Sequence, residues 1–400
     1  MQKFDVIIIG GGIVGLATAY QLKKQNPKLS LAVLEKEDRV GSQQTSHNSG
    51  VIHSGVYYPP GSLKAKNCLQ GREELLSFCE ENGVPFKPLG KVIVATHESE
   101  LKNFEEIAKR GFANQIKGLE IIGKEKLQEI EPNVQGIKAL WVPSCSIVDF
   151  SKVASSLERN LKNMGVQIFC SHKVEKVISE ESSCVIVTSK GDFETKLMIN
   201  CAGIFSDQIA KTAIPKLPLQ IIPFKGEYYE LSEEKKSLVK GLIYPVCDLR
   251  YPFLGIHFTP MMNGSVEIGP NAVLSFSRSK YQKLGVEFTE VLRILKFPGF
   301  WKMGIQNTKT GLYEWFRSFS KKRFVRDAQK LVPSITEKDL KPGLIGLRAQ
   351  VVSQKGEIIY DFRIEEKKHM IHILNAPSPA ATASFAIGKD IANRAFAHLS

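Results

Sequence analysis

Three glycines near the N-terminus, Gly10, Gly12 and Gly15, have the spacing G-x-G-x-x-G and directly follow a short apolar run at 6–9. Glycines in this pattern allow a tight turn at the end of a strand, close approach of a phosphate to the backbone, and close packing of the next helix on that strand. We expect the helix, at about 13–25, to direct its free N–H groups and positive dipole end at the phosphate.

A second apolar segment, 31–34, ends in Glu35, twenty residues after Gly15. An acidic side chain at this spacing can bind the ribose hydroxyls of a nucleotide. Glycine-rich turns without a nucleotide are common, and Glu35 alone could be an exposed strand end. The complete strand, glycine turn, helix and strand context nevertheless predicts a βαβ unit that binds a dinucleotide.

A polar, glycine-rich and aromatic segment follows at 46–58, with the sequence S-H-N-S-G-V-I-H-S-G-V-Y-Y. This composition is typical neither of a simple strand nor of a helix. It suits a segment that approaches a flat cofactor closely and offers hydrogen bonds to it.

The elements that position these residues are spread over the whole chain. Four hundred residues exceed what one core normally organises, so we expect two domains. The apolar run at 197–201, followed by Ala202 and Gly203, indicates a second piece of the nucleotide sheet, without a second glycine fingerprint. Segments 223–231 and 242–270 alternate apolar and polar residues with frequent Gly and Pro, which favours antiparallel sheet.

We therefore predict an α/β protein in which a Rossmann-like nucleotide-binding domain is interrupted by an α+β substrate domain built on an antiparallel sheet. The nucleotide-binding domain is expected to comprise 1–85, 142–218 and 340–400. The substrate domain is expected to comprise 86–141 and 219–339.

The net charge of +13 is concentrated in one region, since 278–330 holds 13 basic and 4 acidic residues. Within it, apolar residues recur at helical spacing at Leu312, Trp315, Phe316 and Phe319. A basic amphipathic helix at 311–326 can lie on an anionic membrane. The alternative is a helix packed on its own domain with a solvated basic face. We expect no nucleic-acid partner, because no recognised binding module is visible.

Other classes of protein are disfavoured. No apolar run approaches the ~18 residues of a membrane span. The first predicted strand starts within the first few residues, so we expect no leader peptide. Seven cysteines show neither a C-x-x-C pair nor a His/Cys cluster, so we expect no disulfide framework and no metal site. These features favour a cytoplasmic protein. The basic helix adds the hypothesis that it attaches peripherally to the inner face of the cell membrane.

The layout resembles the D-amino-acid-oxidase-like flavoproteins and, more narrowly, the L-2-hydroxyglutarate oxidase/dehydrogenase family. The segments that carry this resemblance are H-N-S-G-V-I-H-S-G-V-Y-Y (47–58), P-G-S-L-K-A-K-N-C (60–68), P-F-K-G-E-Y (223–228), F-L-G-I-H-F-T-P (253–260), G-P-N-A-V-L (269–274), G-L-R-A-Q (346–350) and N-A-P-S-P-A-A-T (375–382).

The resemblance implies FAD as the cofactor, bound by a single fingerprint, with the flavin ring extending from the glycine turn toward 47–58. The helix start at 375–381 is expected to present N–H groups to the negative end of the reduced ring. The residues expected to bind FAD are Gly10, Gly12, Ile13, Val14, Gly15, Glu35, Lys36, Thr45, Ser46, His47, Asn48, Ser49, Gly50, Val174, Ala202, Gly203, Arg348, Pro379, Ala380, Ala381 and Thr382.

It also implies oxidation of L-2-hydroxyglutarate to 2-oxoglutarate, with electrons passed to a membrane quinone or to oxygen. One alternative is a related FAD oxidase or dehydrogenase that acts on an amino acid or glycerol 3-phosphate. A second is a flavin-containing protein whose basic helix binds a membrane or RNA.

Oxidation of a 2-hydroxy acid needs a base for the hydroxyl proton and cations for the carboxylates. His53 is the first candidate for the base and His257 the second, although each could be a structural histidine. Arg348 is the candidate for a carboxylate, against an ion pair with Asp361 or Glu357. Weaker candidates for the anion are Lys225, Tyr57, Tyr58 and Lys64.

The sequence departs from the usual family pattern at four positions: Ser46 replaces Gly, Lys225 replaces Arg, Cys247 replaces Pro, and Tyr360 replaces an acidic residue. Lys225 keeps the positive charge but lacks the two-pronged hydrogen bonding of arginine.

Overall fold

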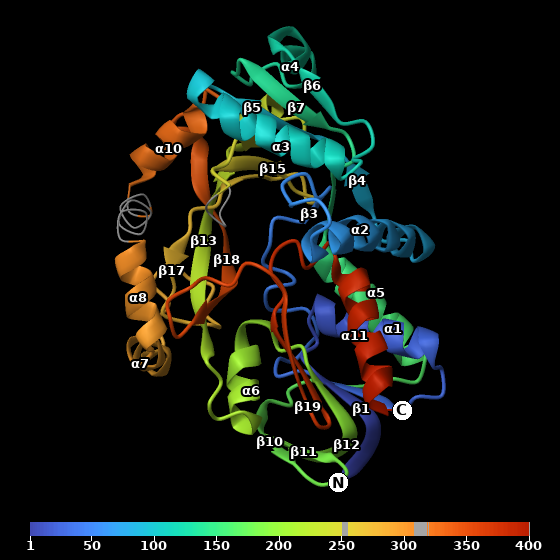
Figure 1. The fold of residues 1–400 in the computed structure, drawn as a ribbon. Coiled ribbons are helices and arrows are strands. Elements are labelled where there is room, and N and C mark those ends of the chain that lie inside the picture. Colours follow the sequence, from blue (N-terminus) through green and yellow to red (C-terminus); the bar gives the residue numbers. More distant parts are fainter. Residues whose placement is uncertain (250–254, 308–317, 319, 400) are drawn as a thin grey trace.

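The computed structural model describes residues 1–249, 255–307, 318 and 320–399. Two large sheets organise this part of the chain, and both are drawn in Figure 1. The sheet with β1 lies at one end, next to α1, α5 and α11, and the sheet with β5 and β7 lies at the other. The long strands β13 and β18 run between the two ends.

The first sheet is the predicted nucleotide sheet. Its strands are β1 (Gln2–Ile9), β2 (Leu31–Leu34), β9 (Gln167–Phe169), β10 (Val174–Ser179), β11 (Cys184–Thr188), β12 (Gly191–Asn200), β19 (Arg363–Lys367) and β20 (Met370–Asn375). β1 is central and pairs in parallel with both β2 and β12. The second half of β12 pairs in parallel with β20, and its first half forms a hairpin with β11.

Four helices pack against this sheet and bury apolar side chains with it in one core. α1 (Ile13–Gln25), α2 (Leu63–Glu81), α5 (Phe150–Asn163) and α11 (Ser384–Leu399) contribute to one core with β1 and β2. α1 and α11 pack so closely that a Cβ on Gly388 would lie 2.7 Å from the Ala17 backbone. The N-terminal helix and the C-terminal helix are thus direct neighbours.

The second sheet carries the predicted substrate domain. Its strands are β5 (Lys91–Ala95), β6 (Glu120–Ile122), β7 (Lys138–Val142), β13 (Leu219–Leu231), β14 (Leu242–Pro245), β15 (His257–Pro260), β16 (Val266–Gly269), β17 (Val273–Leu274) and β18 (Leu340–Ser353). The predicted antiparallel pairing is confirmed except at one place, because β14 pairs in parallel with β5.

The predicted boundary at residue 340 needs correction. β18 pairs with β13 along its length, from Leu219 opposite Ser353 to Leu231 opposite Leu340, and so belongs to the second sheet. The chain returns to the first sheet only at β19. The error has a physical cause: alternation within a strand shows that it is a strand, but not which sheet it joins.

Smaller elements complete the fold. A three-stranded sheet joins β3 (Val51–Ile52), β8 (Ser146–Val148) and β4 (Phe86–Pro88). The remaining helices are α3 (Leu101–Ala113), α4 (Lys124–Ile130), α6 (Ser206–Ala213), α7 (Phe288–Leu295), α8 (Pro298–Gln306) and α10 (Lys321–Gln329), with 3₁₀ turns at η1 (Glu98–Glu100), η2 (Gly203–Phe205), η3 (Glu233–Leu238) and η4 (Glu337–Asp339).

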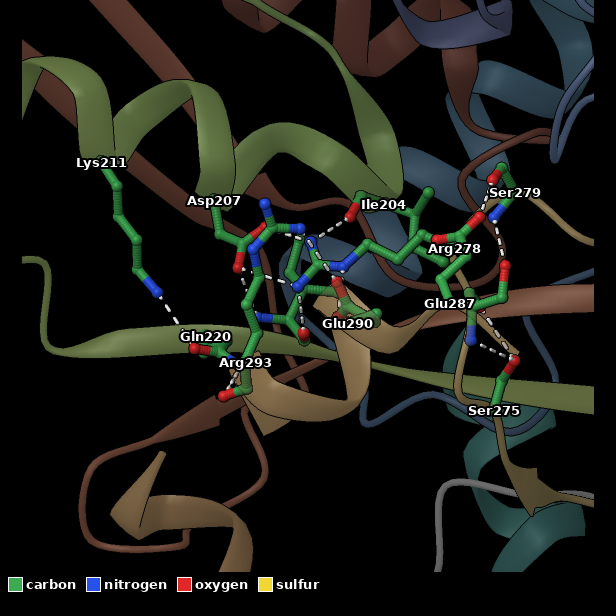
Figure 2. Close-up of polar contacts among 12 residues, drawn as sticks. Ile204, Asp207, Lys211, Gln220, Ser275, Arg278, Ser279, Glu287, Glu290 and Arg293 are labelled. Carbon is green, nitrogen blue, oxygen red and sulfur yellow. Dashed lines mark hydrogen bonds and ion pairs between the residues drawn. The ribbon is translucent and has the colours of Figure 1, made fainter. Parts of the chain in front are cut away.

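A buried ion cluster ties the first sheet's helix α6 to β13 and α7 (Figure 2). The Arg278 guanidinium is 1% exposed and donates to Asp207 at 2.5 Å and to Glu290 at 2.7 Å. It also donates to the carbonyl oxygens of Ile204 and Ile221, each at 2.7 Å. Every charge at the centre of this cluster therefore has a partner, which a buried charge requires.

The predicted basic helix at 311–326 lies mostly outside the described residues. Its described end belongs to α10, which buries Phe324 and Val325 in the core of the second sheet and exposes Lys322, Arg323 and Arg326. This part of the segment matches the alternative of a helix packed on its own domain. In the part of the chain that the structure describes, we find no helix long and apolar enough to cross a membrane.

Candidate active site

The glycine turn at the end of β1 has the geometry that a phosphate needs. Gly10 has φ +110°, and a Cβ there would overlap the carbonyl oxygen of Cys201. A Cβ on Gly15 would overlap the carbonyl oxygen of Gly10, so α1 can approach β1 only without a side chain at this position. Gly12 is the N-cap residue of α1 and has no side chain to cap the helix, and a Cβ on Gly12 would lie 3.5 Å from Thr45 Oγ1.

Two side chains, of Glu35 and Thr45, accept hydrogen bonds from backbone N–H groups of this turn. Glu35 accepts hydrogen bonds from the Gly11 N–H at 2.7 Å and from the Glu37 N–H at 2.9 Å. Burial raises the pKa of Glu35, while these two hydrogen bonds oppose the rise. Thr45 accepts a hydrogen bond from the Ile13 N–H at 3.0 Å. The predicted residues Glu35, Thr45 and Ile13 thus meet at one turn.

The loop around Thr45 is internally hydrogen-bonded. Asn48 donates to the Thr45 carbonyl at 2.6 Å and accepts from the Gly50 N–H at 2.8 Å. The His47 ring stacks on Tyr281 of the other half of the chain, with ring centroids 3.8 Å apart. Ser46 lies next to this stack, 3.0 Å from His47 Nδ1, and Ser49 is half-buried.

Other predicted cofactor residues gather at the same end of the sheet. Ala202 lies against Gly10, and Gly203, with φ +54°, begins the 3₁₀ turn η2. Lys36 lies over the Phe205 ring, with Nζ 4.6 Å from its centroid. Two placements are less direct: Val174 is buried in the core beneath the sheet, and Val14 is half-buried on α1.

The predicted helix start at 375–381 needs correction. α11 begins at Ser384, and residues 378–383 form turns that hold Pro379, Ala380 and Ala381. Asn375 is the last residue of β20, where its amide donates to the carbonyls of Ile359 and Asp361. Asn375 therefore fixes the end of β20 through hydrogen bonds to the chain at 359–361. The turns after it place Thr382 within hydrogen-bonding distance of the His53 N–H.

These features fit FAD. The N-terminus of α1, where Gly12 offers no side chain, can receive the phosphates, and Glu35 directly after β2 can receive a ribose. Thr382 accepts from the His53 N–H at 3.1 Å and donates to the Val51 carbonyl at 3.2 Å, which joins the C-terminal turn to the segment predicted to contact the flavin.

A second group of predicted residues meets on one face of β14 and β15 in the second sheet. The His257 ring stacks on Tyr244 at 4.0 Å. His257 is among the groups that lower the pKa of His53, so the loop after β3 lies near the same place. Tyr57 belongs to the same loop and packs with Tyr244 in one apolar cluster, where its hydroxyl is buried without a hydrogen-bond partner among the described residues.

Both histidines are electrically neutral at ordinary pH. Burial and the charge of Lys91 lower the pKa of His53 well below its usual value. Burial lowers the pKa of His257 to about 3, and Arg348 and Lys91 add to the effect. His257 Nδ1 lies 2.8 Å from the Gly255 carbonyl oxygen, so it must be the protonated nitrogen, which leaves Nε2 as an acceptor.

Arg348 lies at the edge of this histidine pair. It is half-buried on β18, opposite Phe224 in the register. Its guanidinium hydrogen-bonds to the Tyr228 side chain, and its charge lowers the pKa of His257. The structure therefore brings Arg348 together with His257, as the predicted role requires.

Lys225 and Lys64, in contrast, have partners elsewhere. Lys225 forms an ion pair with Glu227 at 3.4 Å and donates to the Lys283 carbonyl. It follows Phe224 on β13 and therefore leaves the strand on the opposite face from Arg348. Lys64 lies on α2, where Asp361 is the charge that influences it. Neither lysine is brought to the histidine pair, which corrects the predicted role of Lys225.

Lys91 is a buried charged residue next to this group that the sequence reasoning did not single out. It is the first residue of β5, is 1% exposed, and its Nζ has no hydrogen-bond partner among the described residues. The Nζ lies 4.5 Å from the Tyr244 ring centroid and 5.4 Å from that of Tyr57. A lysine at the start of an apolar strand normally reaches water, so the sequence offered no signal for its burial.

Comparison with known proteins gives the family. Residues 5–394 match the family model described as FAD dependent oxidoreductase. An L-2-hydroxyglutarate dehydrogenase of Indibacter alkaliphilus is 50% identical over 388 residues, which cover 97% of each chain. A mitochondrial L-2-hydroxyglutarate dehydrogenase of Homo sapiens is 39% identical over 409 residues, covering 98% of this chain and 88% of the relative.

Solved structures agree on the fold. An L-alpha-glycerophosphate oxidase of Mycoplasma pneumoniae with FAD bound superposes with a TM-score of 0.80 at 22% identity, covering 99% of this chain and 95% of the other. A glycine oxidase of Geobacillus kaustophilus superposes with a TM-score of 0.73 at 17% identity, covering 98% and 95%. The predicted family, fold and cofactor are confirmed: the chain is an FAD-dependent oxidoreductase and belongs to the family of the L-2-hydroxyglutarate dehydrogenases.

Proposed function

We propose that this protein oxidises L-2-hydroxyglutarate to 2-oxoglutarate, with FAD as the electron acceptor of the first step. The names of its relatives support this substrate. The observation that carries the proposal is that one site combines two neutral histidines with the Arg348 cation beside the segment predicted to contact the flavin.

Bound FAD supplies the acceptor for the hydride of the substrate C–H bond. The chain's own residues bind the substrate and take the proton. We assign the hydroxyl proton to His53, because it is half-buried and hydrogen-bonded through its backbone to Thr382, whereas His257 is only 3% exposed. A neutral imidazole can accept that proton. Arg348 binds a carboxylate of the substrate through charge-assisted hydrogen bonds.

Anaerobic mixing tests the substrate. Adding L-2-hydroxyglutarate to the oxidised holoenzyme should bleach the flavin absorption band, and D-2-hydroxyglutarate should leave it unchanged. If the band bleaches with glycerol 3-phosphate or an amino acid but not with L-2-hydroxyglutarate, the proposed activity is wrong and a related activity replaces it.

Two matched substitutions test the base. His53→Asn should lower the rate of flavin reduction by about 100-fold or more, because general-base catalysis contributes at least this factor. His257→Asn keeps a hydrogen-bond donor next to Gly255 and should lower the rate less. The opposite order would transfer the role of base to His257.

For the second electron acceptor we propose a membrane quinone, with oxygen as the alternative. Side chains of the α7–α8 region support contact with lipid: Leu284 is 80% exposed, Phe288 74%, Trp301 55% and Ile305 78%. Lys296 and Lys302 are exposed beside them.

Flotation with anionic vesicles tests this surface. Flotation that is lost at high salt, or in a Phe288→Ser/Ile305→Ser variant, would support binding of lipid here. Equal flotation with neutral vesicles would contradict an electrostatic contribution to that binding.

We also propose a domain division that follows the sheets, with β18 assigned to the substrate domain and β19, β20 and α11 to the FAD-binding domain. Limited proteolysis with and without FAD tests it, since bound FAD should protect the second group of elements more than the first.

A further inference from the structure

Lys91 is a buried cation whose surroundings do not account for its charge. Its side chain is 1% exposed, and no carboxylate oxygen of the described residues forms an ion pair with it. Its Nζ lies over the ring faces of Tyr244 and Tyr57. Aromatic faces attract a cation but do not supply the hydrogen bonds that three N–H groups need.

An ammonium group in such a place is costly for the folded protein, so it needs a compensating role. A structural role would leave it paired, as Arg278 is paired with two carboxylates. Lys91 is instead arranged as one half of an ion pair whose other half is not part of the chain's described residues. An anion that enters the site can complete it.

The position of Lys91 indicates which anion. Residues 91, 244 and 257 lie on one face of the neighbouring strands β5, β14 and β15, as the strand register requires. The Tyr244 ring contacts both the Lys91 Nζ and the His257 ring. Arg348 influences the same two residues, Tyr244 and His257. Two cations thus lie near one histidine, and a molecule with two carboxylates is the ligand that can satisfy both.

We propose that Lys91 binds one of the two carboxylates of the substrate while Arg348 binds the other, and that Lys91 thereby makes the enzyme select a dicarboxylate over a monocarboxylate. The proposal deepens the proposed function and rests on it for the identity of the dicarboxylate.

Binding of two acids that cannot be oxidised tests the assignment without turnover. Glutarate has two carboxylates and pentanoate has one, on chains of equal length. Perturbation of the flavin absorption spectrum gives the Kd of each acid for wild type, Lys91→Met and the control Lys87→Met, which removes an exposed lysine of the preceding strand β4. Lys91→Gln serves as a second variant of similar length.

Lys91→Met should weaken glutarate binding by about 50-fold or more and pentanoate binding by less than about 3-fold, since a buried charge-assisted contact is lost for the diacid only. Lys87→Met should change neither. Equal weakening of the two acids, or no weakening of glutarate, would overturn the proposal.

One further measurement covers the case in which both variants fail to retain flavin. At equal concentrations, glutarate should raise the melting temperature of the wild-type holoenzyme more than pentanoate does, and equal shifts would overturn the assignment. Selective glutarate binding that depends on Lys91, in an enzyme that does not oxidise L-2-hydroxyglutarate, would refute the proposed function and keep Lys91 as a dicarboxylate ligand.

Discussion

Arg278 and Lys91 are both cations that are 1% exposed, yet the protein treats their charges in opposite ways. Arg278 has two carboxylates and two carbonyl oxygens around it (Figure 2). Lys91 has two aromatic rings. The first charge is balanced within the fold and joins its two halves. The second is left for a ligand to balance.

The contrast separates two uses of a buried charge. A paired cation helps to fix how the elements around it pack. Its removal leaves the partner carboxylates buried without a counter-charge. An unpaired cation lowers the stability of the free protein and adds to the affinity for an anion. The predictions that follow test these two uses, first at the ion cluster and then at the active site.

The largest effect is expected from Arg278→Met. It leaves Asp207 and Glu290 buried without their cation, so the free energy of unfolding should fall by about 3–5 kcal/mol. Urea unfolding followed by circular dichroism measures it. A loss below about 1 kcal/mol would show that the cluster does not hold the two halves together.

A fall in pH should lower the free energy of unfolding through protonation of His257 in the unfolded chain. Its pKa is about 3 in the folded protein, against about 6.5 when unfolded, so below pH 6.5 the unfolded chain binds a proton that the folded protein does not. The stabilisation is complete above pH 6.5 and is lost as the pH falls toward 3. Between pH 7 and 5, His257→Asn should lose about 2 kcal/mol less stability than wild type does. Identical losses would contradict the lowered pKa.

Lys91→Met should have the opposite sign from Arg278→Met. Removal of an unpaired buried charge, with a side chain of similar volume in its place, should raise the free energy of unfolding of the substrate-free holoenzyme by about 1–2 kcal/mol. The same urea titration measures it. A destabilised Lys91→Met variant would mean that the lysine has a structural partner and would erase the contrast with Arg278.

The smallest effect is expected at the rim of the ion cluster. Arg293 also contacts Glu290, at 3.3 Å, but its side chain is 50% exposed. Arg293→Met should change the free energy of unfolding by less than about 0.5 kcal/mol, because water screens exposed pairs. A loss comparable to that of Arg278→Met would show that pairing matters here independently of burial.

The sequence predicts the glycine turn, the acidic end of β2 and the two-sheet plan, because these depend on local patterns. The G-x-G-x-x-G spacing and Glu35 lie within one βαβ unit, whose geometry is nearly fixed once the strand and helix are assigned. His53, His257 and Arg348 could be named from their sequence surroundings and from the family resemblance, and the structure brings them together.

What the sequence does not predict depends on distant pairing. β18 joins β13 rather than the first sheet, and Lys225 leaves β13 on the face away from Arg348. Lys91 is buried next to the rings of Tyr244 on β14 and of Tyr57, and both residues come from other parts of the chain. Strand periodicity specifies which residues share a face, but not which partner lies on that face.

The central place of β1 has a consequence for synthesis of the protein. β1 and α1 are made long before their partners, because β1 pairs with β12 and α1 packs against α11. At ribosomal rates of about 5–20 residues per second, α1 waits roughly 20–70 s for that partner. The nascent FAD-binding half therefore stays incomplete, with apolar surface exposed, until α11 has left the ribosome, and this interval is where we expect a chaperone to act.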